Sequence, residues 1–483
     1  MIKYLCPLFF TFIGAFSIFT NDLLLLKITV YAIWISNILY ACTNIKKHIV
    51  FFMFHITFFT FLLGNTTASS LAINQDLRTD VISLFSFKTQ IHIYTTLFIS
   101  LVTLFFSYSF FSSRNDNYLV SEININSPRI IAYRRYAKIL SYVFFIFALI
   151  VNLEKTSFVL SSSYIDYYID YKTNLPSIVG KLANFYNFSF YLFLTTMPTK
   201  KECRIPIFLF LLLGLSSLGY GQRNALMLNI SMIVIYYTLR DNINIYGDER
   251  WITKKKIIIA LITLPFLLSL LNAFSFIRSN QDYSFTSSLW DSFVGFFHNQ
   301  GKTVRLIGHE KDLHYKFPLD FPYSLGYFVD RFTNIEFIKP FNMFPSYEPK
   351  SYQLAVYGHN FGETITFLVD PARYYSGGGL GSCYIAEMYH DFGFFGIIFI
   401  NILYSFIFSK VNLLTGYNIW GVFCIMIILE RVLYSPRADA LGCFTEFLSS
   451  AFIVFIILMY YIGHNYPNPP LALEDDTEDY QQK

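Results

Sequence analysis

Residues 392–409 read FGFFGIIFINILYSFIFS, a stretch without a single charged side chain. Asp391 precedes this stretch and Lys410 follows it. A helix of about 20 apolar residues crosses a hydrocarbon core about 30 Å thick. The stretch therefore predicts a transmembrane helix, and it gives a standard for interpreting the rest of the chain.

Eleven further stretches have similar length and apolar character, so the sequence predicts an all-α, polytopic membrane protein with about twelve transmembrane helices. The first resembles a signal peptide, but Asn21 and Asp22 follow it without a small-residue cleavage site, and another span begins at once. We therefore expect an uncleaved helix there. The twelve predicted spans are residues 4–20, 23–43, 49–63, 91–111, 139–153, 178–197, 205–219, 224–239, 257–276, 392–409, 417–434 and 445–462.

The composition of the 483 residues supports this interpretation. Charged residues make up 14% of the chain, against about 25% in soluble proteins, and the mean hydropathy is +0.44. With 55 Phe and 37 Tyr, such a chain cannot build a water-soluble surface, which excludes a cytosolic enzyme and a disordered protein. The scattered net charge of +4 gives no indication of nucleic-acid binding. The six cysteines have no CxxC spacing, so they imply neither a disulfide framework nor a zinc site.

Lysine and arginine are unequally distributed between the two sets of short loops. If the N-terminus is inside, the inner loops carry sixteen of these residues and the short outer loops carry six. Because cytoplasmic loops are enriched in Lys and Arg, this asymmetry predicts that both termini lie in the cytoplasm.

The predicted spans divide the chain into four parts. Residues 1–276 hold spans one to nine, residues 277–391 form a large outer loop, residues 392–463 hold spans ten to twelve, and residues 464–483 form an acidic cytoplasmic tail, which we expect to be disordered. The outer loop is neither low in complexity nor very polar, so we expect it to fold, partly as helices. A long structured loop on one side of a membrane protein usually carries function.

Charged residues also gather near the predicted outer face. Arg223 follows Gly221 at the start of span eight, where the free N–H groups and the positive dipole end of a helix would complete a diphosphate site. The alternative is an interface arginine that extends its charge toward the headgroups. Arg278 ends span nine, where a cation complements the helix dipole with or without a ligand.

The segment with most chemistry is residues 373–393, RYYSGGGLGSCYIAEMYHDFG, which begins with Arg373. Its glycines allow the backbone to approach a ligand closely. At helical spacing Glu387, His390 and Asp391 share one face. A carboxylate beside a histidine on that face could act as a general base, or could simply hydrogen-bond the loop above it.

Other polar residues near the outer face have two interpretations each. His359 and Asn360 lie in a second glycine-containing turn, and they contribute either to the site or to the turn itself. Glu430 and Arg431 lie near the end of span eleven. They are either site residues or the two partners of a partly buried salt bridge. The tyrosine-rich residues 164–171 offer aromatic faces to sugar rings or form an aromatic belt at the interface.

These features together resemble a known family. The chain has about twelve predicted spans, a large outer loop late in the sequence, and GQRN at residues 221–224. It also has GGLGSCYIAE at residues 378–387, running into DFGFFG at residues 391–396. This combination resembles the O-antigen polysaccharide polymerases of Wzy type.

The resemblance implies a bacterial inner-membrane glycosyltransferase of the lipid-donor class. Such an enzyme joins oligosaccharide repeat units carried on undecaprenyl diphosphate, at the periplasmic face, into O-antigen or a related surface polysaccharide. It works in contact with membrane lipid and needs no nucleotide sugar, no cofactor and no metal. The resemblance leaves open whether a chain-length regulator is a further partner.

Arginines in outer loops are the usual functional residues of that family. By this resemblance Arg223 and Arg373 are expected to act on the diphosphate leaving group, with Glu387 as the first candidate for the general base and His359 as the second. The other expected substrate-binding residues are Arg278, Arg437, Arg431, Asn360, Gly378 and Gly379.

Two other functions stay open at this point. An O-antigen ligase has a similar membrane layout and differs in its acceptor. A transporter or flippase of lipid-linked oligosaccharide would be expected to bind its substrate near the midplane and to show internal repeats. This chain has its charges at one face and no evident repeat, which favours the polymerase.

Overall fold

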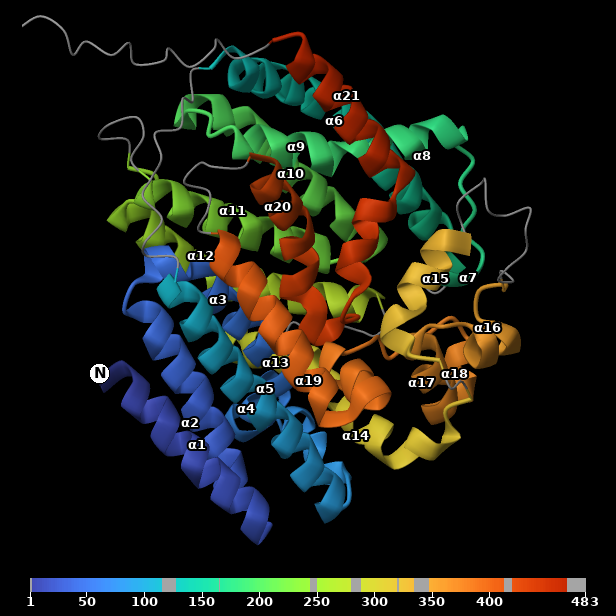
Figure 1. Ribbon diagram of the computed structural model, residues 1–483. Coiled ribbons are helices and arrows are strands. Elements are labelled where there is room, and N and C mark those ends of the chain that lie inside the picture. Colours follow the sequence, from blue (N-terminus) through green and yellow to red (C-terminus); the bar gives the residue numbers. More distant parts are fainter. Residues whose placement is uncertain are drawn as a thin grey trace, which may run out of the picture.

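The computed structural model is all-α (Figure 1). It describes residues 2–114, 127–164, 166–243, 250–278, 288–318, 321–333, 347–411 and 419–466. Within these ranges there are helices, turns and loops but no strand. The expectation for the acidic tail concerns residues that lie almost entirely outside the described ranges.

The N-terminal part is a group of long helices, shown in blue in Figure 1. Helix α2 packs against both α1 and α5. A π-helical turn, Phe59–Leu63, joins α3 to α4 without breaking the run. The bounds are α1 Ile2–Thr20, α2 Leu23–Cys42, α3 Ile45–Phe58, α4 Gly64–Leu71 and α5 Phe87–Arg114.

The middle of the chain adds a second group, in which the long helix α6 packs against α9 and α10. Helix α11 contacts α3 and so joins this group to the first one. The bounds are α6 Pro128–Ser161, α7 Asp166–Ile169, α8 Ser177–Ala183, α9 Phe185–Thr195, α10 Lys200–Ser216, α11 Asn224–Asn242 and α12 Lys254–Arg278.

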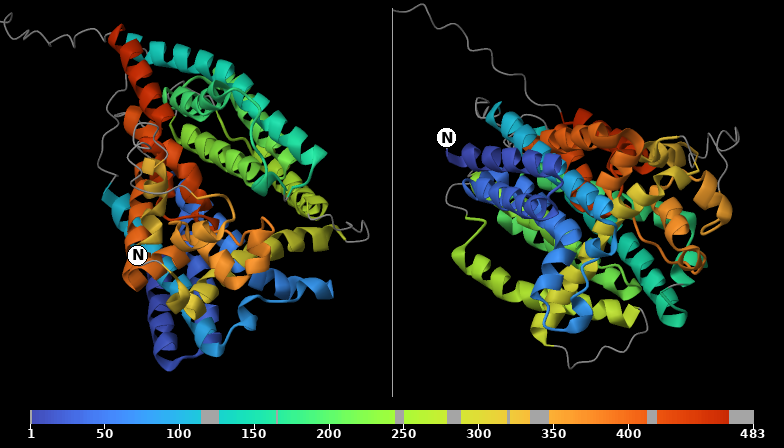
Figure 2. Two further views of the ribbon diagram at one scale, coloured as in Figure 1. Left: turned by 90° about the vertical axis from the view of Figure 1, so that its right-hand side faces the viewer. Right: turned by 90° about the horizontal axis from the view of Figure 1, so that it is seen from below.

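The expected outer loop folds as a layer of short helices. In Figure 1 α14 to α18 gather at the lower right, and the left view of Figure 2, where that side faces the viewer, shows them in front of the bundle. The bounds are α13 Leu289–Gln300, α14 Arg305–Leu313, α15 Gly326–Thr333, α16 Tyr352–Tyr357, α17 Phe361–Val369 and α18 Pro371–Tyr375.

The C-terminal helices complete the bundle: α19 (Tyr384–Lys410), α20 (Ile419–Tyr434) and α21 (Ser450–His464). Helix α19 runs along α5, where Asn401 donates to the Ser100 hydroxyl at 3.3 Å. Gly393 interrupts α19 with φ +59°, a conformation that costs little only without a Cβ. The helix therefore has a short outer piece and a long apolar piece.

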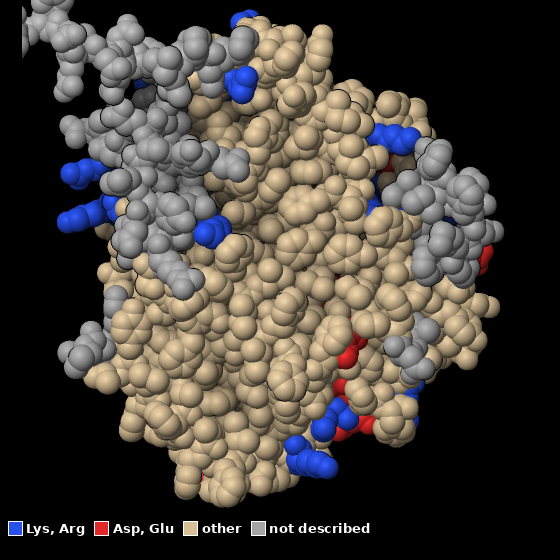
Figure 3. All heavy atoms as spheres, viewed as in Figure 1, with Lys and Arg blue, Asp and Glu red and all other residues tan. Residues whose placement is uncertain are grey.

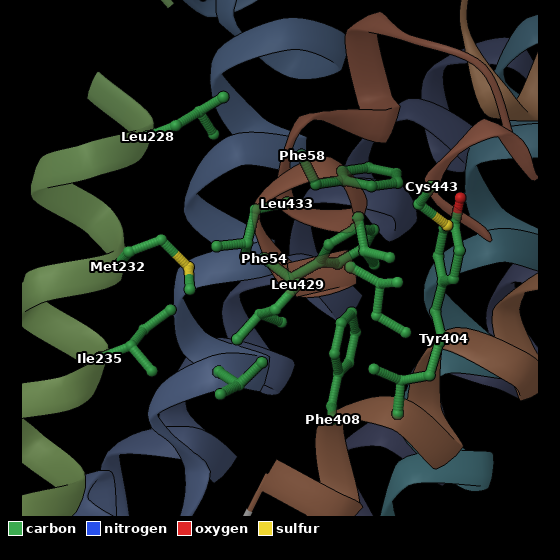
Figure 4. Packing of buried hydrophobic residues seen from close by; sticks show 14 of the residues in the cluster. Phe54, Phe58, Leu228, Met232, Ile235, Tyr404, Phe408, Leu429, Leu433 and Cys443 are labelled. Atoms are coloured by element: carbon green, nitrogen blue, oxygen red, sulfur yellow. The ribbon is translucent and has the colours of Figure 1, made fainter. Parts of the chain in front are cut away.

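The buried core lies between α3, α11, α19 and α20. Figure 4 shows Phe54, Tyr404, Phe408 and Leu429 packed together, with α11 side chains facing them. Phe54 and Leu429 are fully buried. Aromatic rings contribute to this packing, and the Phe54 and Phe408 ring centroids lie 4.9 Å apart.

Among the described residues, eight helices are long and apolar enough to cross a membrane, or nine if the bent pair 442–448 and 450–464 is one span. The all-α, polytopic fold is thus confirmed, and eight or nine described helices meet these criteria where the sequence predicts about twelve spans. Residues 4–20 lie in α1, and this apolar stretch of 17 residues is short for a span. The stretch 178–197 is divided at Asn184 into two helices, and α11 carries polar residues, including Arg240 and Asp241, near its end.

The surface agrees with a membrane environment. Figure 3 shows a broad face without charge, with Lys and Arg toward the left and both signs of charge at the lower right. Large apolar side chains point outward along this chain, for example Phe19 at 86% and Phe395 at 84% exposure. Water would not favour such a surface, whereas lipid tails would.

Candidate active site

A cavity of about 340 Å³ lies between the π-helical turn, the start of α11, α12, α13 and the end of α20. Its apolar walls come from membrane-spanning helices and include Met53, Ile56 and Leu264. Its polar rim includes Arg223 and Arg437. The cavity therefore brings together two arginines that the sequence analysis selected from stretches more than 200 residues apart.

Arg223 is held at the start of α11 by the turn before it. Gly221 has φ +84° and ends a 3₁₀ turn, which requires a residue without a Cβ. Arg223 is the N-cap of α11, and its side chain does not cap the first-turn N–H groups of this helix. Its Nη1 donates to the Leu271 carbonyl of α12 at 2.7 Å. The expected combination of arginine and helix N-terminus thus faces the cavity.

Arg437 ends the 3₁₀ turn that follows α20, after the buried Pro436. Its Nη1 donates to the Thr303 hydroxyl at 2.8 Å, and its guanidinium lies 5.9 Å from the centre of the Phe61 ring. These contacts fix the side chain between the cavity and the loop helices, since Phe61 lines the cavity and Thr303 belongs to the turn before α14.

Three more cations adjoin Arg437: Lys302, Arg305 and Arg373. Burial and the charges of Arg373 and Arg437 lower the pKa of Arg305. Burial and the charges of Arg305 and Arg373 lower the pKa of Lys302. We call Lys302, Arg305, Arg373 and Arg437 the basic cluster. Within the described part of the chain, none of the four forms an ion pair with a carboxylate. Like charges held together in this way favour binding of an anion.

Lys302 and Arg305 were not predicted as site residues from the sequence, and their position explains why. They lie on either side of the start of α14, inside the long loop, where no span or motif indicates which residues face the membrane helices. The signal that could have found them is the spacing of Lys302 and Arg305, which puts two cations on one face of a helical turn.

Arg373 is held by the glycine-rich turn that follows it, whose glycines the sequence placed beside a ligand. Gly377 and Gly381 have φ of +84° and +83°. A Cβ on Gly378 would lie 2.6 Å from the Cγ of Arg373, so only glycine lets this side chain lie across the turn. The Arg373 Nη2 then donates to the Gly379 carbonyl at 3.3 Å. Gly378 and Gly379 therefore position an arginine in this structure.

Glu387 is fully buried near the start of α19. Its Oε2 accepts from the Ala440 N–H at 3.0 Å and from the Ser382 hydroxyl at 3.4 Å, whereas Oε1 has no hydrogen-bond partner among the described residues. Glu387 lines neither the 340 Å³ cavity nor a second one beside His390. It connects α19 to the loop that follows Arg437.

Asp439 is a second carboxylate at this place, and the sequence analysis missed it. It is half-buried, two residues after Arg437, and burial raises its pKa. The charge of Arg431 opposes that shift. Asp439 is thus partly exposed where Glu387 is fully buried, although it too lines neither of the two cavities.

His359 and Asn360 have separate local roles. The His359 ring lies against Phe321 at 4.9 Å, and burial lowers its pKa while the charge of Asp330 raises it. Asn360 Oδ1 accepts from the Glu363 N–H at 3.2 Å and caps α17. His359 is half-buried and lines neither of the two cavities.

The remaining expected residues lie apart from the cavity. Arg431 is half exposed and forms an ion pair with Glu446, so the alternative salt bridge with Glu430 is wrong. Glu430 instead accepts from the Tyr191 hydroxyl at 2.7 Å. The side chain of Arg278 lies outside the described residues.

The expected face of Glu387, His390 and Asp391 is divided between two contacts. Asp391 accepts from the N–H groups of Tyr323 and Ser324 at 2.9 and 2.7 Å, and so hydrogen-bonds the loop. His390 faces Glu310 of α14 at 3.3 Å. Among the tyrosines of residues 164–171, Tyr164 and Tyr168 line the 340 Å³ cavity, where their rings can contact a sugar.

Comparison with known proteins identifies the family. The family model for O-antigen polysaccharide polymerase Wzy matches residues 2–466. The chain belongs to the Wzy family. Members of the Wzy family act on lipid-linked oligosaccharide repeat units in the membrane, and this chain is a multi-pass bacterial membrane protein with O-antigen polymerase function. No curated protein and no solved structure matches the chain.

Proposed function

We propose that this Wzy protein polymerises undecaprenyl-diphosphate-linked oligosaccharide repeat units at the periplasmic face of the inner membrane. The observation that carries the proposal is the cavity, with apolar walls from membrane-spanning helices and an arginine rim that continues into the basic cluster. A polyprenyl diphosphate has the matching form, with an apolar chain and a dianionic head.

The two ends of the donor would lie at different depths. Met53, Ile56 and Leu264 belong to spans, so the wall that they form extends the membrane interior and suits a polyprenyl chain. Arg223, the first turn of α11 and Arg437 would bind the diphosphate. Tyr164 and Tyr168 would then contact the first sugars.

The reaction transfers the growing chain to an incoming unit. A hydroxyl of the incoming sugar attacks the anomeric carbon of the growing chain, a new glycosidic C–O bond forms, and the C–O bond to undecaprenyl diphosphate breaks. The leaving diphosphate keeps the electron pair, so negative charge develops on it. Arginine suits this charge because its planar fork binds phosphate oxygens in pairs and stays protonated.

The acceptor hydroxyl loses its proton in the same reaction, and that proton needs a base. Asp439 is our candidate because it is half-buried and follows Arg437 by two residues. Glu387, our first candidate from the sequence, is fully buried and hydrogen-bonded to the same loop, which favours a positioning role. His359 stays the second candidate.

On this proposal, the positive charge that stabilises the leaving diphosphate comes from the basic cluster of the protein. Each charged hydrogen bond to the diphosphate would contribute roughly 1.5 to 3 kcal/mol. Two or three such bonds would supply several kcal/mol of stabilisation to the leaving group. On this proposal the transfer needs no metal and no nucleotide sugar.

The test is complementation of a strain that lacks the gene, followed by gel analysis of its surface polysaccharide. Loss of a polymerase leaves lipid A core with one repeat unit, whereas loss of a ligase leaves no repeat attached and loss of a flippase delivers none. Arg437→Ala should lower polymer formation by about 10- to 150-fold, the equivalent of one charged hydrogen bond. Arg437→Lys should recover only part of it, because a point charge lacks the fork.

Arg78→Ala is the control, since Arg78 is also on the expected outer side but is exposed and donates to the Ala72 and Ile73 carbonyls of its own loop. It should keep polymer formation within a few-fold of wild type. Full activity of Arg437→Ala and of Arg305→Ala, at normal protein abundance, would remove the basic cluster from the mechanism.

A further inference from the structure

A second cluster of polar side chains lies at the other end of α14. Glu310 accepts from Nδ1 of His314 at 2.7 Å and faces Nδ1 of His390 at 3.3 Å. One ligand atom from each of the three side chains lies within 4.8 Å of the others. Glu310 and His314 are one helical turn apart, whereas His390 comes from α19, 76 residues later in the chain.

The burial of the Glu310 carboxylate is not explained by its hydrogen bonds alone. Its side chain is fully buried, and Oε2 has no hydrogen-bond partner among the described residues. A buried carboxylate is costly unless it is paired or binds a metal. Its described ion-pair partners are the two histidines, which carry charge only when protonated. A cation between the three side chains would satisfy the carboxylate and leave both imidazoles neutral.

The cluster also has an open side. A second cavity, of about 360 Å³, is lined by His314, His390, Asp391 and aromatic side chains, including Phe317. Asp391 already accepts two backbone N–H groups, so it supports the loop and is not available as a fourth ligand. Solvent in the cavity could occupy the remaining coordination position.

We propose that Glu310, His314 and His390 bind one Zn²⁺ ion and so hold α14 against α19. Two imidazoles and one carboxylate with an open position form a donor set typical of zinc. Zinc bonds of about 2.0 to 2.2 Å place tetrahedral ligand atoms about 3.4 Å apart, so small ring rotations convert the observed cluster into a site. The site does not depend on the proposed transfer mechanism, because none of its three ligands lines the arginine cavity.

The experiment measures zinc bound to the full chain, purified in detergent with a tag that contains no histidine. The protein is stripped with EDTA, dialysed against Zn²⁺ and analysed for metal content, and its thermal midpoint is recorded with and without Zn²⁺. We expect one zinc per chain and a higher midpoint with zinc. Glu310→Gln, His314→Ala and His390→Ala should each lower the affinity at least tenfold.

His309→Ala is the matched control, because His309 lies on the same helix but packs against Phe85 at 5.0 Å. It should bind zinc as wild type does. His314 is half exposed, so His314→Ala keeps the test valid if a buried variant fails to fold. Wild-type protein without stoichiometric zinc, or unchanged binding in His314→Ala, would overturn the proposal. Neither of these two results would test the proposed polymerisation. If Arg437→Ala binds zinc as wild type does, the zinc site and the arginine cavity are independent of each other.

Discussion

Glu387 and Asp439, two carboxylates close to Arg437 in the fold, differ in how far their side chains are exposed. Glu387 has no exposed surface and accepts from a backbone N–H and a hydroxyl. Asp439 is half-buried in the loop that Glu387 holds. A group that cannot reach the acceptor hydroxyl can position another group but cannot take the proton. The geometry thus assigns different roles to two chemically similar side chains.

This assignment predicts different effects for two amide substitutions. Asp439→Asn should lower polymerisation by about 10²- to 10⁴-fold, the usual contribution of a general base. Glu387→Gln should stay within about tenfold of wild type, because the amide oxygen still accepts from Ala440. The measurement is in vitro polymerisation of a lipid-linked repeat unit by the purified variants across pH.

The pH profile gives an independent check with a definite sign. Burial raises the pKa of Asp439, so the acid limb of wild-type activity should lie above the ordinary pKa of an aspartate. Activity should fall as the pH drops through this raised pKa, because the base becomes protonated. The folded protein then binds that proton more tightly than the unfolded chain does, so this group makes folding more favourable on acidification. Equal losses of polymerisation in Asp439→Asn and Glu387→Gln would contradict the roles assigned to these two carboxylates.

The residues that sequence reasoning found and missed differ in their local signals. Arg223 and Arg437 lie next to span ends, where hydropathy itself marks the outer face, and both line the cavity. Lys302 and Arg305 reach the same region only because the loop helices dock on the spans. Arg431 also borders a span end, but a nearby glutamate engages it, and sequence alone does not show this pairing.

At the scale of elements, the docking of α13 and of the turn Gly301–Val304 on α4 builds the basic cluster. A Cβ on Gly301 would lie 2.0 Å from the backbone nitrogen of Asn65, so the two segments touch through their backbones. Asn65 fixes the contact, because its Nδ2 donates to the His298 carbonyl at 3.0 Å and its Oδ1 accepts from the Val81 N–H at 2.9 Å. Lys302 follows Gly301 directly, so the contact determines where the cation lies.

Gly301→Ala should therefore separate these segments. We expect a loss of about 1 to 3 kcal/mol of stability from overpacking, together with reduced polymer formation. Gly180→Ala is the control, because no atom lies within 4 Å of a Cβ at that helical position. It should be neutral or slightly stabilising, since alanine favours helix. Thermal unfolding in detergent and gel analysis measure the two effects, and equal behaviour of the variants would refute the contact's importance.

Elements with a long uninterrupted apolar run were the most predictable. The stretch 392–409 lies within α19, as expected, although the helix begins eight residues earlier. The stretch 178–197 is also predicted as one span but is divided at Asn184. Burial of α9 by its neighbours lets a short helix be stable there. The hydropathy of a segment indicates that the segment avoids water. It does not show whether the segment contacts lipid or the interior of a helical protein.

At the scale of the whole molecule, the charges separate toward two ends. Residues of four expected inner loops meet one another: Lys46 pairs with Asp241 at 2.8 Å, Arg134 donates to the Thr196 carbonyl at 2.8 Å, and Lys200 to the Arg250 carbonyl. The basic cluster joins the ends of other helices to the loop layer. The apolar surface between them is that expected of a membrane belt (Figure 3).

The orientation of these two ends is the last prediction. Because the expected inner loops hold sixteen Lys and Arg against six in the short outer loops, we expect the basic cluster to face the periplasm and both termini the cytoplasm. In a variant without Cys6 and Cys42, the exposed native thiols, a membrane-impermeant maleimide should label cysteines placed at Lys172 and Ser376 in intact cells. Cysteines at Ser113 and Lys201, also exposed, should react only after lysis. The reverse pattern would put the arginine rim in the cytoplasm, where the proposed periplasmic polymerisation could not use it, while membership of the Wzy family would stand.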